Sequence, residues 1–377
     1  MELIRMRKND TMGIILAGED MIPPITDIRA DIALPIAGRY RIIDFVLSSM
    51  ANSGIMNIGV ATTSKYSSLM DHIKSGKPWD LDRKSGGLNI LPPSIGRSFG
   101  SIKGNIDILE GISDYIRRNS QTYVILSLGS EIYNIDFDAA IEHHINSQAD
   151  VTVIYKDRNG DEESELSRYT LIEMDENNRV KDIEVRPRYP KSHAASMDIY
   201  IMERVLLESI VDECSARGDS DFVKDALSKK IDGMRIFGYE HEGLSYKVDS
   251  MASYYQTNMN FLDSEIRREL FNPHSPIYTK TKDQSPSKYG SNAVVENSFI
   301  SDGCVIEGTV INSVLSRGVR VEEGAVIKNS IIMQDSVIER DAELHHVVFD
   351  KNVIITKGRK LIGQKSYPLA ISKGTKI

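Results

Sequence analysis

A repeat of about 16 residues near the carboxyl end most narrows the possible fold. Four short units recur with spacings of 15, 17 and 16 residues: Asn297-Ser298-Phe299-Ile300, Asn312-Ser313-Val314-Leu315, Asn329-Ser330-Ile331-Ile332 and His345-His346-Val347-Val348. A second series keeps the same step: Ile306, Val321, Ile338 and Ile354. Three short strands per unit, each turning at Gly, Asn or Asp, predict a parallel β-helix of triangular section. An ordinary sandwich would not hold this register over four units.

The first half of the chain alternates short apolar runs with helical patterns. The strand-like runs are residues 13–18, 55–60, 123–128 and 151–155, and the helical stretches are residues 40–53, 104–118 and 135–147. This alternation predicts an α/β domain with a mostly parallel sheet covered on both faces. Ligands of such sheets bind beyond the carboxyl ends of the strands. We therefore expect chemistry in the loops that follow Leu16 and Leu128.

The two patterns divide the chain into domains. We expect an α/β domain over residues 1–248, a helix from Asp249 to Leu270 with a linker up to residue 290, and the β-helix over residues 291–377. The linker is indicated by its proline and serine content.

Composition excludes several classes of function. The net charge of −8 argues against non-specific binding to nucleic acid or an anionic membrane. Cys214 and Cys304 stand far apart, so we expect neither a disulfide framework nor a zinc site. The charged residues 1–8 are unlike a signal peptide, and no run approaches the ~20 apolar residues of a membrane span. A cytoplasmic protein is the expectation.

One block of sequence is specific enough to identify a family. It consists of Pro24-Ile25-Thr26, Arg29-Ala30, Leu34-Pro35-Ile36-Ala37-Gly38-Arg39-Tyr40-Arg41-Ile42-Ile43-Asp44-Phe45 and Asn52-Ser53-Gly54-Ile55. This block closely resembles the glucose-1-phosphate adenylyltransferase (ADP-glucose pyrophosphorylase) family, and weaker matches extend from about residue 12 to 355. The resemblance implies a Rossmann-like nucleotidyltransferase domain followed by a left-handed parallel β-helix of hexapeptide repeats.

The family joins ATP and glucose 1-phosphate to give ADP-glucose and pyrophosphate, and here its phosphate loop is degraded. The family pattern is Gly-Gly-x-Gly-x-Arg-Leu, whereas this chain has Gly18-Glu19-Asp20-Met21-Ile22-Pro23-Pro24. Only Gly18 survives, and the acidic residues and prolines disfavour a triphosphate. Glu19 and Asp20 taken singly also fit a solvated loop. Beyond this loop, a phosphate-facing lysine of the family is replaced by Asp31.

The positions of the family's two metal-binding aspartates are also changed. The first is Ser130 and the second, in the run Lys247-Val248-Asp249-Ser250, is Lys247. Glu131 is the alternative carboxylate, although its place in the chain directs it differently. A serine and an ammonium group are poor ligands for Mg²⁺. We therefore expect no intact catalytic residue, no metal site and no intrinsic cofactor, with ATP and Mg²⁺ bound only at a partner's site.

Other family positions are partly kept. Gly104 and Asp107 are vestiges of the nucleotide site, and Arg186 stands where the family has a lysine that meets the sugar phosphate. Asp198 replaces a family glycine and would repel that phosphate. Arg39 matches a basic position of the family's anionic-effector site, and Arg41 lies beside it. An effector such as a sugar bisphosphate or pyruvate suits paired guanidinium groups, but pairing with Asp44 as part of the packing is equally compatible.

The resemblance extends to GlgD-type chains, which some bacteria carry beside the catalytic chain and whose nucleotide site is degraded. It implies a regulatory subunit that joins a catalytic chain in a heterotetramer, with a homo-oligomer as a further possibility. Two alternatives stay open. One is a weakly active adenylyltransferase or another sugar-phosphate nucleotidyltransferase. The other is an acyltransferase-like β-helix protein, disfavoured because His345 and His346 occupy turn positions of the repeat.

Overall fold

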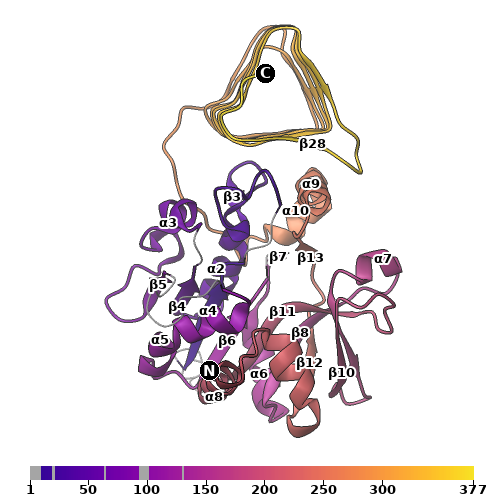
Figure 1. The fold of residues 1–377 in the computed structure, drawn as a ribbon. Coiled ribbons are helices and arrows are strands. Elements are labelled where there is room, and N and C mark those ends of the chain that lie inside the picture. The colour runs from indigo at the N-terminus through magenta and orange to yellow at the C-terminus, as the bar shows by residue number, and fades with distance from the viewer. Residues whose placement is uncertain (1–9, 19–21, 63–64, 93–101, 130) are drawn as a thin grey trace. The chain divides into compact units, whose positions relative to one another are not determined.

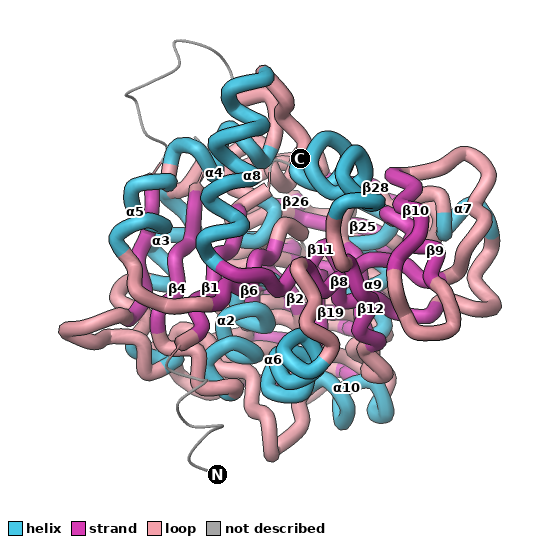
Figure 2. Tube along the Cα trace, turned by 90° about the horizontal axis from the view of Figure 1, so that it is seen from below, coloured by secondary structure: helices cyan, strands magenta, loops and turns pink. Residues whose placement is uncertain are grey.

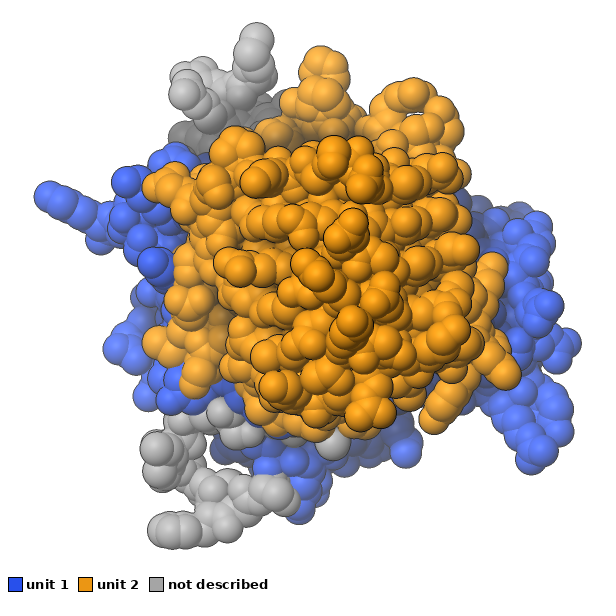
Figure 3. Space-filling model, turned by 90° about the horizontal axis from the view of Figure 1, so that it is seen from above, with its two compact units in different colours: residues 1–18, 47–66, 74–245 blue, residues 19–46, 67–73, 246–377 orange. Residues whose placement is uncertain are grey.

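The computed structural model describes residues 10–18, 22–62, 65–92, 102–129 and 131–377. The chain divides into two compact units, which Figure 3 distinguishes by colour. Unit 1 comprises residues 1–18, 47–66 and 74–245, and unit 2 comprises residues 19–46, 67–73 and 246–377. Residues 19–46 and 67–73 thus belong to the compact unit that holds the β-helix, while the boundaries at residues 248 and 290 remain predictions.

Unit 1 is built around a mixed sheet, in which nine strands fall within the described residues. They are β1 (Thr11–Leu16), β4 (Asn57–Ala61), β5 (Gly87–Leu91), β6 (Tyr123–Ser127), β8 (Val151–Asp157), β9 (Thr170–Met174), β10 (Val180–Val185), β11 (Ala194–Glu203) and β12 (Ile236–Glu240). Strands β5, β4, β1 and β6 run parallel, and β8 is parallel to β12. Strand β11 joins the two groups because it is antiparallel to both β6 and β8.

Helices cover both faces of this sheet (Figure 2). On one side lie α4 (Asn105–Gly111), α5 (Ser113–Arg118) and α8 (Arg204–Arg217), and on the other lies α6 (Phe137–Asn146). Helix α8 shows why: Leu207, Ile210, Val211 and Cys214 follow the spacing of one helical face, and all four are buried in the core. Each buried aliphatic side chain of this kind contributes about 1.5–3 kcal/mol.

Other short elements complete unit 1. They are η2 (Lys77–Trp79), β7 (Glu131–Tyr133), α7 (Glu163–Leu166), η3 (Phe222–Leu227) and η4 (Ser228–Gly233). Helix α2 (Ile42–Asn52) begins in unit 2 and ends in unit 1, and β13 (Ser245–Lys247) runs from unit 1 into unit 2. The helix expected over residues 104–118 is interrupted at Ile112, so that part of the prediction is wrong.

Unit 2 contains the predicted parallel β-helix, whose strands stack in three sheets of a triangular coil (Figure 1). The first sheet holds β14 (Lys288–Tyr289), β17 (Val305–Ile306), β20 (Arg320–Val321), β23 (Val337–Ile338) and β26 (Ile354–Ile355). The second holds β15 (Val294–Glu296), β18 (Thr309–Ile311), β21 (Val326–Lys328), β24 (Glu343–His345) and β27 (Lys360–Ile362). The third holds β16 (Phe299–Ile300), β19 (Val314–Leu315), β22 (Ile331–Ile332), β25 (Val347–Phe349) and β28 (Leu369–Ile371).

The register of the coils corrects the repeat at its last step. Ile338 pairs with Ile355, and Ile331 pairs with Val348, so the final spacing is 17 residues and the prediction of Ile354 is wrong. The reason is conformational. His346 has φ +51°, which matches the positive φ of Asn329 and its counterparts in earlier coils. Asparagine tolerates this left-handed conformation, which therefore marks one corner of the triangle.

The remaining elements of unit 2 pack around the coils. They are η1 (Asp31–Ala33), β2 (Pro35–Ile36), β3 (Tyr40–Arg41), α3 (Ser67–Ile73), α9 (Met251–Asn260) and α10 (Ser264–Leu270). The single helix expected over residues 249–270 is two helices, because Asp263 caps a new helix by accepting the N–H of Glu265 at 2.8 Å. No helix among the described residues has the length and apolarity that crossing a membrane requires.

A buried ion pair ties residues 22–34 to the coils. Arg29 Nη2 lies 2.8 Å from Asp350 Oδ1 and 3.0 Å from Oδ2, while Nη1 donates to the carbonyl oxygen of Ile25 at 2.8 Å. The exposed fractions of Arg29 and Asp350 are only 2% and 1%. Tyr254 of α9 adds a second tie through its hydroxyl, which donates to Pro35 O at 2.6 Å.

Candidate functional site

The carboxyl edge of the unit 1 sheet is the first candidate site. In the register of the sheet, Leu16 pairs with Ala61 and Ile15 pairs with Ser127, so β1, β4 and β6 end at one edge. Gly18 and Gly129 follow this edge in the loops that the sequence singled out. Residues 19–21 and 130, which include the predicted positions Met21 and Ser130, lie outside the described residues.

Asp198 places a carboxylate at this edge. A Cβ built on Gly129 would lie 3.2 Å from Asp198 Cβ and 3.6 Å from its Oδ2. The approach is fixed by the backbone, since Leu128 N–H donates to Asp198 O at 2.9 Å and Asp198 itself has φ +54°. The register of β11 shifts against β8 between Ser196 and Ile199, which turns this residue out of the regular ladder. A sugar phosphate bound beside Gly129 would be repelled.

The vestigial residues have structural roles in this chain. A Cβ on Gly104 would lie 2.3 Å from the carbonyl oxygen of Ser220, and Ile106 N–H donates to that same oxygen at 3.0 Å. Asp107 Oδ2 accepts the N–H of Lys103 at 2.6 Å. Arg186 is exposed after β10 with φ +48°, and its N–H donates to Tyr169 O. Nucleotide or sugar-phosphate binding by these residues stays a prediction.

The other substituted positions are enclosed by the protein. Asp31 in unit 2 is 1% exposed, and its Oδ1 accepts the N–H of Ile32 at 2.7 Å. Lys247 at the end of β13 is 8% exposed, and Glu131 at the start of β7 is 1% exposed. Across the described ranges, no group of three or more histidine, cysteine or acidic side chains is arranged to hold a metal ion.

A second candidate site lies within unit 2, and we call it the cationic pocket. It is lined by Pro35, Gly38, Arg39, Tyr40, Arg41, Asp71, His72, Lys280, Lys282, Ser316, Arg317, Gln334 and Lys351. The β2–β3 turn, helix α3, the segment before the first coil and one corner of the coils supply these residues. Six of the side chains are lysine or arginine, whereas only one is acidic.

The repeat places part of this pocket. Arg317, Gln334 and Lys351 are 17 residues apart, and each precedes a residue with positive φ: Gly318, Asp335 and Asn352. They therefore occupy the same corner in successive coils. Sequence analysis missed Arg317 and Lys351, although their spacing equals the final step of the repeat and could have revealed them.

Arg41 is the predicted effector residue that is most firmly held. Its exposed fraction is 8%, and its Nη1 donates to Ser68 O at 2.6 Å and to Ser68 Oγ at 3.0 Å. Its backbone N–H donates to Asp44 Oδ2 at 3.0 Å, and His72 Nε2 lies 2.6 Å from the other oxygen of Asp44. Burial lowers the pKa of Arg41 to about 10, although Asp44 opposes the shift. The Arg41 guanidinium therefore also has a packing role.

Two coil residues give the pocket its unbalanced charge. Arg317 is 7% exposed, and within the described part of the chain its Nε has no hydrogen-bond partner. Burial, followed by the nearby Arg39, lowers the pKa of Arg317. Burial, followed by Arg41 and Arg29, lowers the pKa of Lys351 to about 8. Crowded and partly dehydrated cations are stabilised when an anion joins them.

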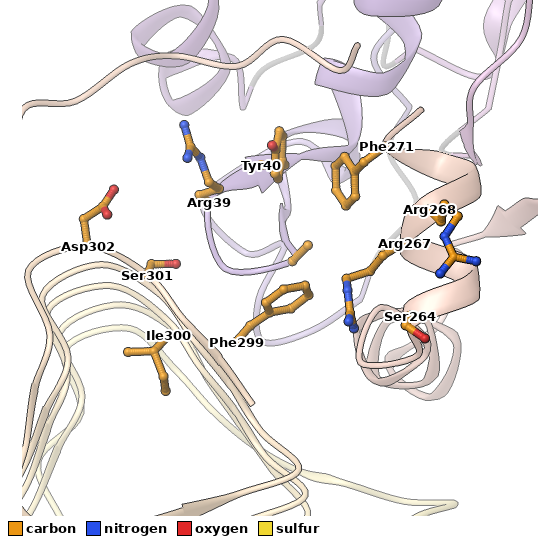
Figure 4. A pocket seen from close by; sticks show the side chains of 11 residues that line it. Arg39, Tyr40, Ser264, Arg267, Arg268, Phe271, Phe299, Ile300, Ser301 and Asp302 are labelled. Carbon is orange, nitrogen blue, oxygen red and sulfur yellow. The ribbon is translucent and has the colours of Figure 1, made fainter. Parts of the chain in front are cut away.

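An aromatic pocket adjoins the other side of Arg39 in unit 2 (Figure 4). Tyr40 and Phe271 lie with ring centroids 4.8 Å apart, and the Arg267 guanidinium lies 5.4 Å from the centroid of Phe299. The cavity has a volume of about 500 Å³, and Asp302 contributes a carboxylate. Arg39, which is exposed, lines both pockets.

Comparison with known proteins decides the family. A family model described as nucleotidyl transferase matches residues 12–263, and one described as GlmU-like C-terminal hexapeptide matches residues 283–366. Glucose-1-phosphate adenylyltransferase of Bacillus cereus (strain ATCC 10987 / NRS 248) is 32% identical over 368 residues, which are 96% of each chain. The chain belongs to the glucose-1-phosphate adenylyltransferase family.

Within this family, the chain is also similar to a protein with a different name. The glycogen biosynthesis protein GlgD of Bacillus subtilis (strain 168) is 33% identical over 375 residues, which are 98% of this chain and 97% of the relative. Identities of 32% and 33% do not separate the two roles. The distinction for this adenylyltransferase-family chain must therefore come from the sites.

The structure sorts the predicted site residues of this adenylyltransferase-family chain into two groups. Arg39 and Arg41 meet in the cationic pocket, together with basic residues that sequence analysis did not identify. Gly129 and Asp198 meet at the carboxyl edge of the sheet, where the carboxylate disfavours a phosphate. The chain therefore has a well-built anion pocket and an unfavourable substrate edge.

Proposed function

We propose that this chain is a regulatory subunit of ADP-glucose pyrophosphorylase in glycogen biosynthesis and is catalytically impaired when alone. The observation that carries the proposal is the contrast between the two sites. The sheet edge presents the Asp198 carboxylate, whereas the cationic pocket keeps six basic side chains. A chain that responds to anions without performing the transfer is the function this contrast supports.

The chemistry proposed for the partner needs groups that this chain lacks. Attack of glucose 1-phosphate on the α-phosphorus of ATP requires carboxylates that hold Mg²⁺ and donors that hold the phosphates. Ser130 and Lys247 do not suit Mg²⁺ as ligands. We therefore assign ATP and Mg²⁺ to the catalytic partner's site and derive no step through them here.

Assembly with the catalytic chain is the second part of the proposal. In the described part of the chain, strands β27 and β28 end their sheets without a further strand beyond them. Near this end, Ile362 and Tyr367 are 66% and 81% exposed. Open strand edges with apolar neighbours favour pairing with another chain. We propose a heterotetramer with the catalytic chain in the cytoplasm, and a homo-oligomer when the partner is absent.

The anion pocket supplies the regulatory input of the proposal. Six cations with one acidic neighbour suit a phosphate ester, such as a sugar bisphosphate, or a carboxylate such as pyruvate. Regulation requires that the anion bind one state of the assembly more tightly than another.

The decisive experiment measures pyrophosphate release from ATP and glucose 1-phosphate by this chain alone, by the catalytic chain alone, and by the two co-expressed. We expect the chain alone to be silent and to raise kcat or lower KM of its partner. Robust turnover by the isolated chain, unaffected by Ser130→Ala or Lys247→Ala, would refute the proposal. It would instead support a self-sufficient adenylyltransferase, the candidate favoured by the similarity to the Bacillus cereus enzyme.

The effector proposal has its own test with a matched pair of variants. Arg317→Ala removes a buried guanidinium from the pocket, whereas Arg340→Ala removes an exposed one from a coil residue that does not line the pocket. Titration with a sugar bisphosphate or inorganic phosphate, followed by thermal shift, should show at least tenfold weaker binding for the first variant only. Equal affinities in both variants would place anion binding elsewhere.

A further inference from the structure

A third cavity lies entirely within unit 1, at the edge of the sheet opposite the candidate catalytic edge. It has a volume of about 660 Å³, within the range of small-molecule sites. Its lining consists of Tyr123, His144, Ile145, Gln148, Ala149, Asp150, Glu203, Leu206, Gly233, Met234 and Arg235. Strands β6, β8 and β12 begin here, and β11 ends here, so the proposed adenylyltransferase chemistry does not use this cavity.

A buried histidine forms part of the wall. His144 is 2% exposed, its Nδ1 lies 2.8 Å from Thr152 Oγ1, and its ring packs edge-on against Tyr123 at 5.6 Å. Burial, with a smaller contribution from His143, lowers the pKa of His144 to about 4, so the ring is neutral at pH 7. Because Nδ1 is engaged, Nε2 is the ring nitrogen left for a ligand that lacks charge.

The charges of the lining exclude an anionic ligand. Arg235 is already paired, since its Nη2 and its backbone N–H donate to the two oxygens of Asp150 at 2.8 and 2.7 Å. Glu203 then contributes a carboxylate that no basic residue of the lining is seen to neutralise. A phosphate or nucleotide would meet net negative charge here, in contrast to the cationic pocket.

The remaining groups suit hydroxyls on one side and an apolar face on the other. Leu206 and Met234 are partly buried hydrophobic residues that pack against the core of unit 1. Gln148 and Glu203 are exposed beside them, with planar amide and carboxylate groups that donate to or accept from hydroxyl groups. A sugar ring has this pair of surfaces, with C–H groups on its face and hydroxyls around its rim.

We propose that this cavity binds a neutral sugar ring, with its C–H face on Leu206 and Met234 and its hydroxyls on His144 Nε2, Gln148 and Glu203. The site is separate from the proposed regulatory function and does not rest on it. A failure of the activation experiment would leave this proposal standing, because binding is measured on the isolated chain.

The test is titration of the full chain with maltotriose, followed by calorimetry and ligand-observed NMR, with spermidine and inorganic phosphate as cationic and anionic probes. We expect saturable maltotriose binding at one site that glucose 1-phosphate does not displace. Tighter binding of spermidine, displacement by glucose 1-phosphate, or absence of maltotriose binding would each overturn the proposal.

Three variants locate the binding site. Leu206→Trp fills the cavity and should weaken maltotriose binding at least tenfold. Val205→Trp is the control, because Val205 is adjacent in the chain, 60% exposed and outside the lining. Gln148→Gly removes the amide at a residue with φ +51°, where glycine is favoured, so weaker binding cannot be attributed to misfolding. Unchanged affinity in both Leu206→Trp and Gln148→Gly would overturn the assignment.

Discussion

Replacement of Arg29 by methionine tests how residues 22–34 are held to the coils. The change leaves the Asp350 carboxylate buried, at 1% exposure, without the guanidinium that lies 2.8 and 3.0 Å from its oxygens. Breaking a buried pair in this way costs about 3–5 kcal/mol. At about 2–4 °C per kcal/mol for a domain of 150–250 residues, the melting temperature should fall by about 6–20 °C.

Urea unfolding and calorimetry of the single variants and of the double variant Arg29→Met with Asp350→Leu measure this effect. The double variant should recover much of the loss, because no unpaired charge remains buried. Arg268→Met is the control, since the Arg268–Glu265 pair is 72% and 74% exposed and should contribute no more than about 0.5 kcal/mol. A loss below about 1 kcal/mol for Arg29→Met, or additive single effects, would refute the reasoning.

Three further predictions concern the sites. Lys351 has a pKa of about 8, below its ordinary 10.5, so phosphate affinity should fall as the pH rises from 7 to 9, and Lys351→Arg should flatten that profile in a binding titration; by itself this depressed pKa makes folding more favourable as the pH rises between about 8 and 10.5. Gly104→Ala should destabilise the chain by about 1–3 kcal/mol in urea unfolding, because its Cβ would lie 2.3 Å from Ser220 O; an unchanged midpoint would show that the loop yields. Asp198→Gly removes the carboxylate beside Gly129 and should tighten glucose 1-phosphate binding at least tenfold by calorimetry, whereas equal affinity would show that the carboxylate does not face the ligand.

The fold could be predicted wherever one local pattern repeats. The coil period identified the β-helix, since each coil buries its aliphatic residues only against its neighbours. It failed by one residue at the last step because Ile354 and Ile355 are both aliphatic, and only the positive φ of His346 marks the corner. The helix over residues 249–270 was divided by the Asp263 cap, which hydrophobic spacing does not register.

The candidate sites were less predictable, because they join segments that are distant in sequence. Arg39 and Arg41 were found through resemblance, but Arg317 and Lys351 come from coil corners that look like solvated turns in isolation. The cavity around His144 gave no signal, since a lone histidine in a helical pattern is usually a packing residue. Its lining is assembled from loops at four strand ends.

The shared corner of Arg317, Gln334 and Lys351 separates two kinds of information along the same coil. The strands between corners bury aliphatic residues and determine stability, whereas the corner side chains face the pocket and determine which ligand is held. A substitution at one corner therefore alters ligand preference with little effect on the packing of the coils. The regulatory response of such a chain can diverge among relatives by single substitutions 17 residues apart, while the scaffold that carries them stays the same.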